Sequence, residues 1–258
     1  MDGKVAIVTA AGRGIGEATA RELGRRGYRL ALMSVSDSSK RLAKELDGIG
    51  LQGSVAKEDD LKRLVDETLA RYGRVDAVVN NTGRYSSVLK QFGVDYHAPV
   101  TAASVTYDAE GESPLLDLPD AAWHAVLDAL MLNVVRMARL VTSAMVRQGG
   151  GAIVNISGVE AVQPRILFPT SPMRLAVHGF TKLYADRYGR HGIRMNTVLP
   201  GFLENIEIAS AEVPRMVPLG RLGKTTEIAK TIAFLLSEDA GYISGQAIAV
   251  DGALNRGL

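Results

Sequence analysis

Short apolar runs alternate with longer amphipathic stretches along most of the chain. The runs lie at residues 5–8, 29–33, 49–55, 75–79, 151–156, 193–199 and 247–250, and helical spacing recurs at 18–26, 40–46, 59–72, 120–146 and 226–236. A strand buried in a parallel sheet reads as a continuous apolar run, and helical crossovers join such strands. The pattern predicts a single doubly wound α/β domain over residues 1–258, with a parallel sheet of about seven strands.

The first apolar run ends in a glycine-rich turn that opens the first helix. From Thr9 to Gly16 the sequence reads T-A-A-G-R-G-I-G. Glycines let the backbone approach a ligand closely, and the free N–H groups of a helix start hold a pyrophosphate. The turn predicts dinucleotide binding by a Rossmann-type sheet, and a glycine turn without a ligand is the alternative. The expected contacts are Thr9, Ala11, Gly12, Arg13, Gly14, Ile15 and Gly16.

Composition narrows the class of protein. Hydrophobic residues make up 47% of the 258 residues, and the net charge of +2 comes without a run of lysine and arginine. We therefore expect no nucleic-acid or membrane partner. The absence of cysteine excludes disulfides and thiolate chemistry, and no metal site is predicted. The first strand begins too early for a signal peptide, and no apolar run approaches the ~18 residues of a membrane span, which predicts a cytoplasmic protein.

The end of the second apolar run bears on cofactor choice. An acidic residue at this point holds the adenosine ribose hydroxyls of NAD. Here the candidate positions at this end are Ser34, Val35 and Ser36, none of them acidic, and Arg13 in the glycine turn can pair with a 2′-phosphate. The pattern favours NADP(H) and leaves NAD(H) possible. Asp37 would serve as the acid if the strand ran further, and a solvated loop arginine is the other interpretation of Arg13.

Several short motifs follow one another from the end of the fourth run onward. They are Asn80-Asn81-Thr82-Gly83, then G-A-I-V-N-I-S at 151–157, G-F-T-K at 179–182, N-T-V-L-P-G at 196–201 and S-G-Q at 244–246. From about residue 3 to 252 the chain resembles the short-chain dehydrogenase/reductase family. The resemblance implies a nicotinamide dinucleotide, a small-molecule substrate and a homotetramer or homodimer. It also implies cofactor contacts at Ser54, Val55, Asn81, Gly83, Pro200, Gly201 and Leu203, with Asn205 at the usual threonine position.

One segment, at about residues 84–118, interrupts the resemblance. It is rich in tyrosine and proline and shows little helical periodicity. Long loops in compact domains are usually functional or disordered. Its position after the fourth strand predicts a substrate lid, with an oligomer contact as the alternative.

The catalytic motif of the family is absent. Hydride transfer to a carbonyl needs a proton donor, and tyrosine, with a pKa of about 10, needs a nearby cation to serve. The family that this chain resembles supplies both the proton-donating tyrosine and the cation in a Tyr-x-x-x-Lys motif. Here the two positions fall on Thr170 and Arg174, and no Tyr-x-x-x-Lys occurs anywhere. Arg174 keeps a positive charge for the nicotinamide ribose.

Two further site residues follow from the resemblance. Asn133 lies inside a predicted helix, where the family asparagine kinks the helix and holds a water of the proton relay; a hydrogen-bonded core asparagine is the alternative. The family serine falls on Ser157 or on Gly158. Because strand residues alternate between faces, that one-residue difference decides whether the serine points into the site, and we favour Ser157.

Three functions fit this sequence. The leading hypothesis is an NADP(H)-dependent oxidoreductase of a small organic carbonyl or alcohol with a substitute proton donor. The donor would be a water held by Ser157 and Thr170, or a side chain of the insertion: Tyr85, Tyr96, His97 or Tyr107. The others are a non-redox enzyme and a binding module that retains the dinucleotide without turnover, because fold alone does not determine function.

Overall fold

The computed structural model describes residues 3–82, 116, 118–164, 171–206 and 212–257. Seven strands form one sheet in the order β3-β2-β1-β4-β5-β6-β7, and all six pairings are parallel. The strands are β1 Val5–Thr9, β2 Arg29–Ser34, β3 Ile49–Gln52, β4 Ala77–Asn80, β5 Gly151–Ile156, β6 Ile193–Pro200 and β7 Ala247–Val250. The predicted doubly wound α/β fold with a seven-stranded parallel sheet is confirmed.

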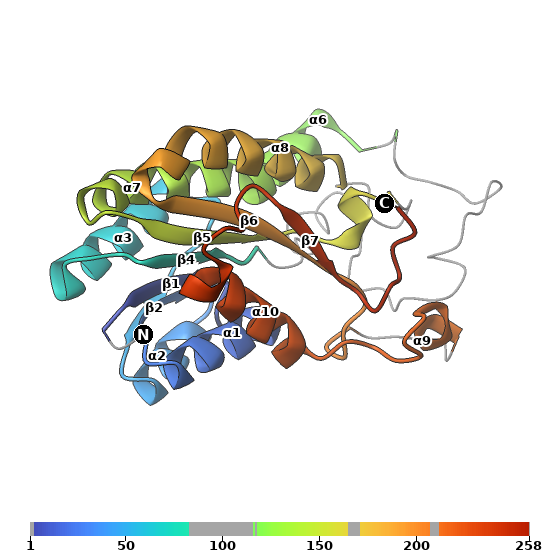
Figure 1. The fold of residues 1–258 in the computed structure, drawn as a ribbon, viewed down its shortest axis with the longest axis horizontal. Coiled ribbons are helices and arrows are strands. Elements are labelled where there is room, and N and C mark those ends of the chain that lie inside the picture. The colour runs from blue at the N-terminus through green and yellow to red at the C-terminus, as the bar shows by residue number, and fades with distance from the viewer. Residues whose placement is uncertain (1–2, 83–115, 117, 165–170, 207–211, 258) are drawn as a thin grey trace.

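Helices cover both faces of the sheet (Figure 1). One layer contains α1 Gly14–Arg25, α2 Ser38–Glu45 and α10 Thr225–Leu236. The other contains α3 Glu58–Tyr72, α7 Asn133–Arg147 and α8 Ser171–Tyr188. Shorter elements are α6 Asp120–Val126, η1 Leu127–Leu132, η2 Val159–Ala161, η3 Gly189–His191, α9 Glu212–Met216 and η4 Glu238–Ala240.

The central strands are buried on both faces, which explains their continuous apolar runs. Along β1, Ala6 and Val8 pack into the layer of α1 and α10, whereas Ile7 packs into the layer of α3 and α7. All three side chains are fully buried. Because every strand runs in the same direction, their carboxyl ends meet along one edge, and the predicted site residues gather there.

The segment Asp120–Arg147 is one continuous helical stretch with a π-helical turn at η1. It contains no long uninterrupted apolar run, but its most apolar window has a mean hydropathy of 1.4, so by length and composition alone this helix could cross a membrane. Half of that window is buried inside the protein, as in the core helix of a globular domain. Packing against the sheet accounts for its apolar character.

Side-chain hydrogen bonds set two strand boundaries differently from the sequence pattern. The third strand ends at Gln52 rather than Val55, because the Ser54 N–H donates to the Asp60 carboxylate (2.9 Å) and turns the chain. The fourth strand begins at Ala77 rather than Val75, because both backbone polar groups of Val75 bind the Gln148 side chain. An apolar run marks burial, whereas a strand also needs ladder hydrogen bonds.

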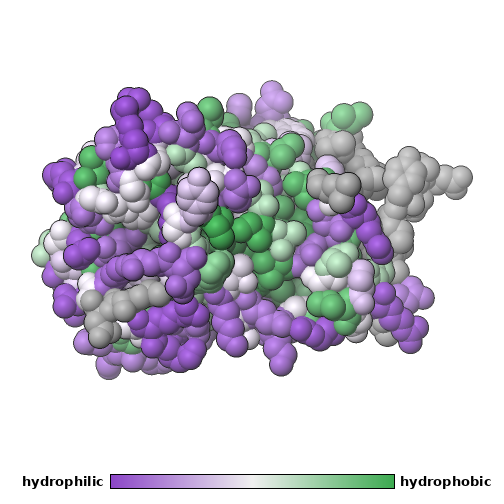
Figure 2. Space-filling view, viewed as in Figure 1, coloured by the Kyte–Doolittle hydropathy of each residue, from purple (hydrophilic) through white to green (hydrophobic). Residues whose placement is uncertain are grey.

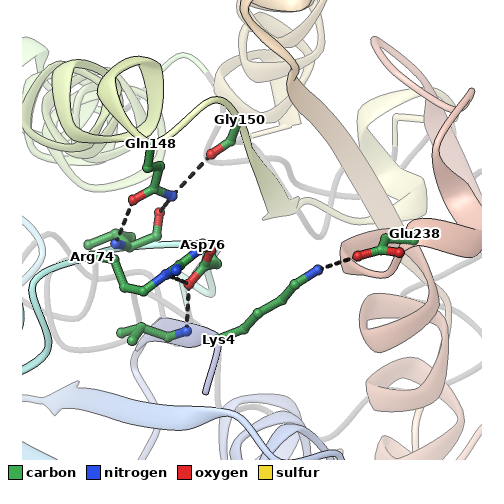
Figure 3. Close-up of polar contacts among 8 residues, drawn as sticks. Lys4, Arg74, Asp76, Gln148, Gly150 and Glu238 are labelled. Carbon is green, nitrogen blue, oxygen red and sulfur yellow. Dashed lines mark hydrogen bonds and ion pairs between the residues drawn. The ribbon is translucent and has the colours of Figure 1, made fainter. Parts of the chain in front are cut away.

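The amino ends of the strands are joined by polar contacts (Figure 3). The Asp76 carboxylate accepts from the Val5 N–H at 2.8 Å and from the Arg74 guanidinium at 2.6 and 2.8 Å. Lys4 pairs with the exposed Glu238 across a groove of about 490 Å³. These contacts lie at the opposite edge of the sheet from the predicted site, so their role is structural. The predicted insertion at 84–118 lies outside the described residues, apart from Leu116 and Leu118.

Candidate functional site

The glycine turn lies directly against its neighbours, which explains why glycine is needed. A Cβ built on Gly16 would lie 2.3 Å from the Ala10 carbonyl oxygen and 2.5 Å from the Asn81 amide. On Gly12, a Cβ would lie 1.9 Å from the Ser38 hydroxyl. The Asn81 side chain donates to the Ala10 carbonyl (3.1 Å), and the Asn81 N–H donates to the Thr9 hydroxyl (3.1 Å). The first turn of α1 therefore packs directly against the residues that follow β1 and β4.

The amino end of α1 offers donors for an anion. No side chain caps it: Arg13 occupies the N-cap position in an extended conformation, and its side chain is exposed. Gly14 has a φ of +58°, and a Cβ built there would lie 2.7 Å from the Asn205 amide nitrogen. Uncapped N–H groups at a helix start, close backbone approach and an exposed guanidinium fit a dinucleotide pyrophosphate. Of the other predicted contacts, Ala11 and Ile15 face the core, and the Ala11 N–H donates to the Met33 carbonyl (3.0 Å).

The turn between β2 and α2 is lined by serine hydroxyls. Ser34 is buried and donates to the Ser36 carbonyl (3.0 Å) while it accepts from the Ser39 N–H (3.1 Å). Its hydroxyl therefore shapes the turn. Ser36 and Ser38 are more exposed, with hydroxyl oxygens 2.8 Å apart, and Ser38 lies beside Gly12. The sequence prediction named Ser34 and missed Ser38, because only the turn geometry brings Ser38 to the glycine turn.

Asp37 does not lie at the end of the second strand. Strand β2 ends at Ser34, and Asp37 occupies the N-cap position of α2. Its carboxylate pairs with Arg41 at 3.1 Å on the surface. No acidic residue thus ends β2.

The remaining predicted cofactor residues lie at the same edge of the sheet or beside it. Ser54 forms the turn after β3, where its hydroxyl accepts from the Ala56 N–H (3.3 Å), and Val55 packs against the α3–α7 layer. Pro200 ends β6, the Gly201 N–H donates to the Val250 carbonyl (3.2 Å), and Leu203 bridges to Gly223. Gly83 lies outside the described residues.

Ser157 follows β5 immediately and faces α8. Its hydroxyl lies 3.0 Å from Nε2 of His178, and its backbone N–H extends the ladder to the Val198 carbonyl (2.9 Å). Asn155, two residues earlier, points the same way and donates to Thr181 of α8 (3.0 Å). Burial, and then the nearby Arg174, lowers the pKa of His178 from its ordinary value of 6.5. The sequence prediction missed His178, although it lies one helical turn beyond Arg174 on α8.

Arg174 forms an ion pair that the sequence prediction also missed. Its Nε lies 2.8 Å from the Glu160 carboxylate, and each side chain is only 14% exposed. The carboxylate occupies the space beside Gly158, where a Cβ would lie 2.1 Å from it. The positive charge of Arg174 is therefore balanced by the Glu160 carboxylate at the candidate site. Thr170, the other expected member of the catalytic pair, lies outside the described residues.

Asn133 lies where the helix changes type. It is buried, it is the first residue of α7 after the π-helical η1, and its amide donates to the Ala129 carbonyl. π-Helical turns disrupt the regular hydrogen-bond ladder and often mark functional sites. Burial and the bond to Ala129 match the alternative of a hydrogen-bonded core asparagine, and a role of Asn133 in a proton relay stays a prediction.

Comparisons with known proteins agree with this geometry. The family model described as short chain dehydrogenase matches residues 4–213. The chain belongs to the short-chain dehydrogenase family. A 3-oxoacyl-(acyl-carrier-protein) reductase FabG of Thermotoga maritima is 30% identical over 269 aligned residues, covering 98% of each protein. A cis-4-hydroxycyclohexanecarboxylate dehydrogenase of Sinomonas cyclohexanicum is 31% identical over 261 residues, covering 96% of this chain and 95% of that protein.

Family membership makes the protein an oxidoreductase, and members of this family bind a nicotinamide dinucleotide and act on small molecules. In this chain the residues that would hold the cofactor are the glycine turn, the start of α1 and the segment after β6. The bound nicotinamide supplies or accepts hydride. The chain's own residues must then hold and move the proton.

Proposed function

We propose that this protein is an NADP(H)-dependent oxidoreductase that interconverts a small organic carbonyl and its alcohol at a rebuilt proton-transfer site. The preference for NADP(H) is supported by one observation above all. The turn after β2 presents the Ser36 and Ser38 hydroxyls, Ser38 lies beside Gly12, which precedes the exposed Arg13, and the Asp37 carboxylate of this turn is bound by Arg41. Hydroxyls and a guanidinium suit a 2′-phosphate, whereas a free carboxylate would repel it.

The substrate class is supported by the names of the relatives. One is a reductase of a 3-oxoacyl group and the other a dehydrogenase of a hydroxycyclohexane carboxylate. Both names describe a carbonyl–alcohol pair. We extend to this chain only that shared chemistry, because the residues expected to line the substrate pocket include the insertion at 84–118, which is the expected substrate lid.

Removal of Arg13 tests the cofactor preference. In Arg13→Ala we expect the Kd for NADPH to rise roughly tenfold or more, as one charge-assisted contact is lost, with the Kd for NADH nearly unchanged. Cofactor fluorescence titration measures both. Arg25→Ala is the matched control, because Arg25 lies at the far end of the same helix and pairs with Glu22. Equal weakening of NADPH and NADH in Arg13→Ala would contradict the 2′-phosphate assignment.

The alternative function is a divergent member that binds the dinucleotide without ordinary carbonyl reduction, as a non-redox enzyme or a binding module. The Arg174–Glu160 pair favours it, because the cation at the lysine position is already neutralised. Oxidation of NADPH in the presence of a carbonyl panel distinguishes the two. Tight binding without turnover supports the alternative, and no dinucleotide binding contradicts both.

We further propose a homotetramer or homodimer in the cytoplasm. Strand β7 is the last strand of the sheet, and apolar side chains gather near the middle of the face on which it lies (Figure 2). Phe234 and Tyr242 are exposed close to it in sequence, and Leu175 and Leu183 are exposed on α8. Exposed apolar patches of this kind usually contact a partner. Light scattering of the purified protein gives the oligomer size.

A further inference from the structure

The contact between Ser157 and His178 joins the carboxyl end of β5 to α8 through a residue, His178, that lies outside the Tyr-x-x-x-Lys positions. Ser157 stands at the carboxyl end of β5, and His178 lies in the interior of α8. Their side chains meet at 3.0 Å. Ser157 is only 6% exposed, so its hydroxyl needs a partner, and the partner is a titratable ring rather than a backbone carbonyl.

The surroundings of His178 favour the neutral imidazole. The ring is partly buried, and Arg174 lies one turn away on the same helix. Across from Arg174, η2 contributes Glu160, which is paired with that guanidinium; on η1, Asp128 is bound by Arg136 at 2.6 Å. No carboxylate among the described residues is paired with His178 itself. A neutral ring whose Nε2 accepts a hydrogen bond turns Ser157 into the donor and makes its oxygen a better base.

The Ser157–His178 contact and the Arg174–Glu160 ion pair lie next to each other. Gly158 leaves room for the Glu160 carboxylate, Glu160 binds Arg174, and Arg174 lies one turn from His178, which binds Ser157. A largely buried ion pair is seldom more stabilising than well-packed apolar residues of similar volume. Stability alone therefore does not account for this arrangement.

We propose that Ser157 and His178 are the proton-transferring pair of this enzyme, Ser157 at the substrate oxygen and His178 as its positioning, proton-holding partner. The proposal rests on the proposed function. In alcohol oxidation, the substrate hydroxyl proton passes to Oγ of Ser157 while the serine's own proton passes to Nε2 of His178. The substrate C–H bond breaks with its electron pair leaving as hydride to the oxidised nicotinamide, and a C=O bond forms. Carbonyl reduction is the reverse.

The principal test compares His178→Gln with wild type in steady-state kinetics over a range of pH. Glutamine keeps a hydrogen bond to Ser157 and does not titrate. We expect kcat to fall about 100-fold or more, KM and the NADPH Kd to change little, and the wild-type rise of alcohol oxidation with pH through the His178 titration to disappear. Ser157→Ala should lower kcat by a similar factor, and the double variant should lower kcat no further. His191→Gln is the matched control, because His191 lies in η3, beyond the carboxyl end of α8.

A second readout does not depend on turnover. NMR titration of the four histidine rings follows His178 directly. Ser157→Ala should shift both the pKa of His178 and the resonance of its Nε2. A His178 signal that is unchanged in Ser157→Ala overturns the proposal, as does a His178→Gln enzyme with wild-type kcat and pH profile. Wild-type protein that binds dinucleotide but turns over no carbonyl or alcohol overturns the proposed function together with this pair. Wild-type turnover with unaffected variants overturns the pair alone.

Discussion

At the scale of single residues, the most informative position is Ala10 in the glycine turn. It has a φ of +47°, in the left-handed region that favours glycine. The Thr9–Gly16 turn resembles the T-G-x-x-x-G-x-G turn of the short-chain dehydrogenase family, which carries glycine at this place. A left-handed non-glycine residue is strained by roughly 1–2 kcal/mol. The turn therefore keeps its shape at some expense of stability, because Asn81 holds the Ala10 carbonyl at 3.1 Å.

Ala10→Gly should raise the free energy of unfolding by up to about 1 kcal/mol, since the relief of strain exceeds the entropy that glycine adds to the unfolded chain. Urea titration measures this change. Ala11→Gly is the control: Ala11 is fully buried and does not have a positive φ, so the same change should destabilise the protein by about 1 kcal/mol. Destabilisation by both variants would show that Ala10 is not strained.

At the scale of elements, side chains outside the ladder decide where strands begin. The Asp76 carboxylate, with 10% of its side chain exposed, holds the Val5 N–H at the start of β1 and the Arg74 guanidinium beside it. The first ladder residue of β1 thus depends on a side chain more than seventy positions away. No local pattern contains that information.

Asp76→Ala should lower the free energy of unfolding by about 1–3 kcal/mol, because it leaves the Val5 N–H and Arg74 without their acceptor. Urea titration again provides the measurement. Glu238→Ala removes a carboxylate from the same groove, where it is 89% exposed and pairs with Lys4; we expect a change below about 1 kcal/mol. Equal effects of the two substitutions would argue against a special role for Asp76.

At the scale of the whole molecule, the burial of His178 links stability to pH. Its pKa is lowered in the folded protein, chiefly by burial, so the unfolded chain binds more protons as the pH falls below the ordinary value of 6.5. The neutral ring therefore contributes stability that is present above that value and is lost as pH falls through the folded pKa.

Between about pH 7.5 and 5.5, the unfolding free energy of wild type should decrease more than that of His178→Gln, which lacks the titrating ring. Urea midpoints at the two pH values measure the difference. Glu227, whose pKa the Arg221 guanidinium lowers to about 2, titrates well below this range. Parallel pH profiles for the two proteins would contradict the lowered pKa.

The sequence determined the fold class and the edge of the sheet at which the site lies. Short continuous apolar runs that alternate with amphipathic stretches are typical of strands covered on both faces, and a glycine turn between such a run and a helix points backbone donors at that edge. The tertiary structure decided which side chains meet there. His178, Glu160 and Ser38 are unremarkable in sequence, because their significance comes from partners that are distant or in another element, and only packing brings those partners within hydrogen-bond reach.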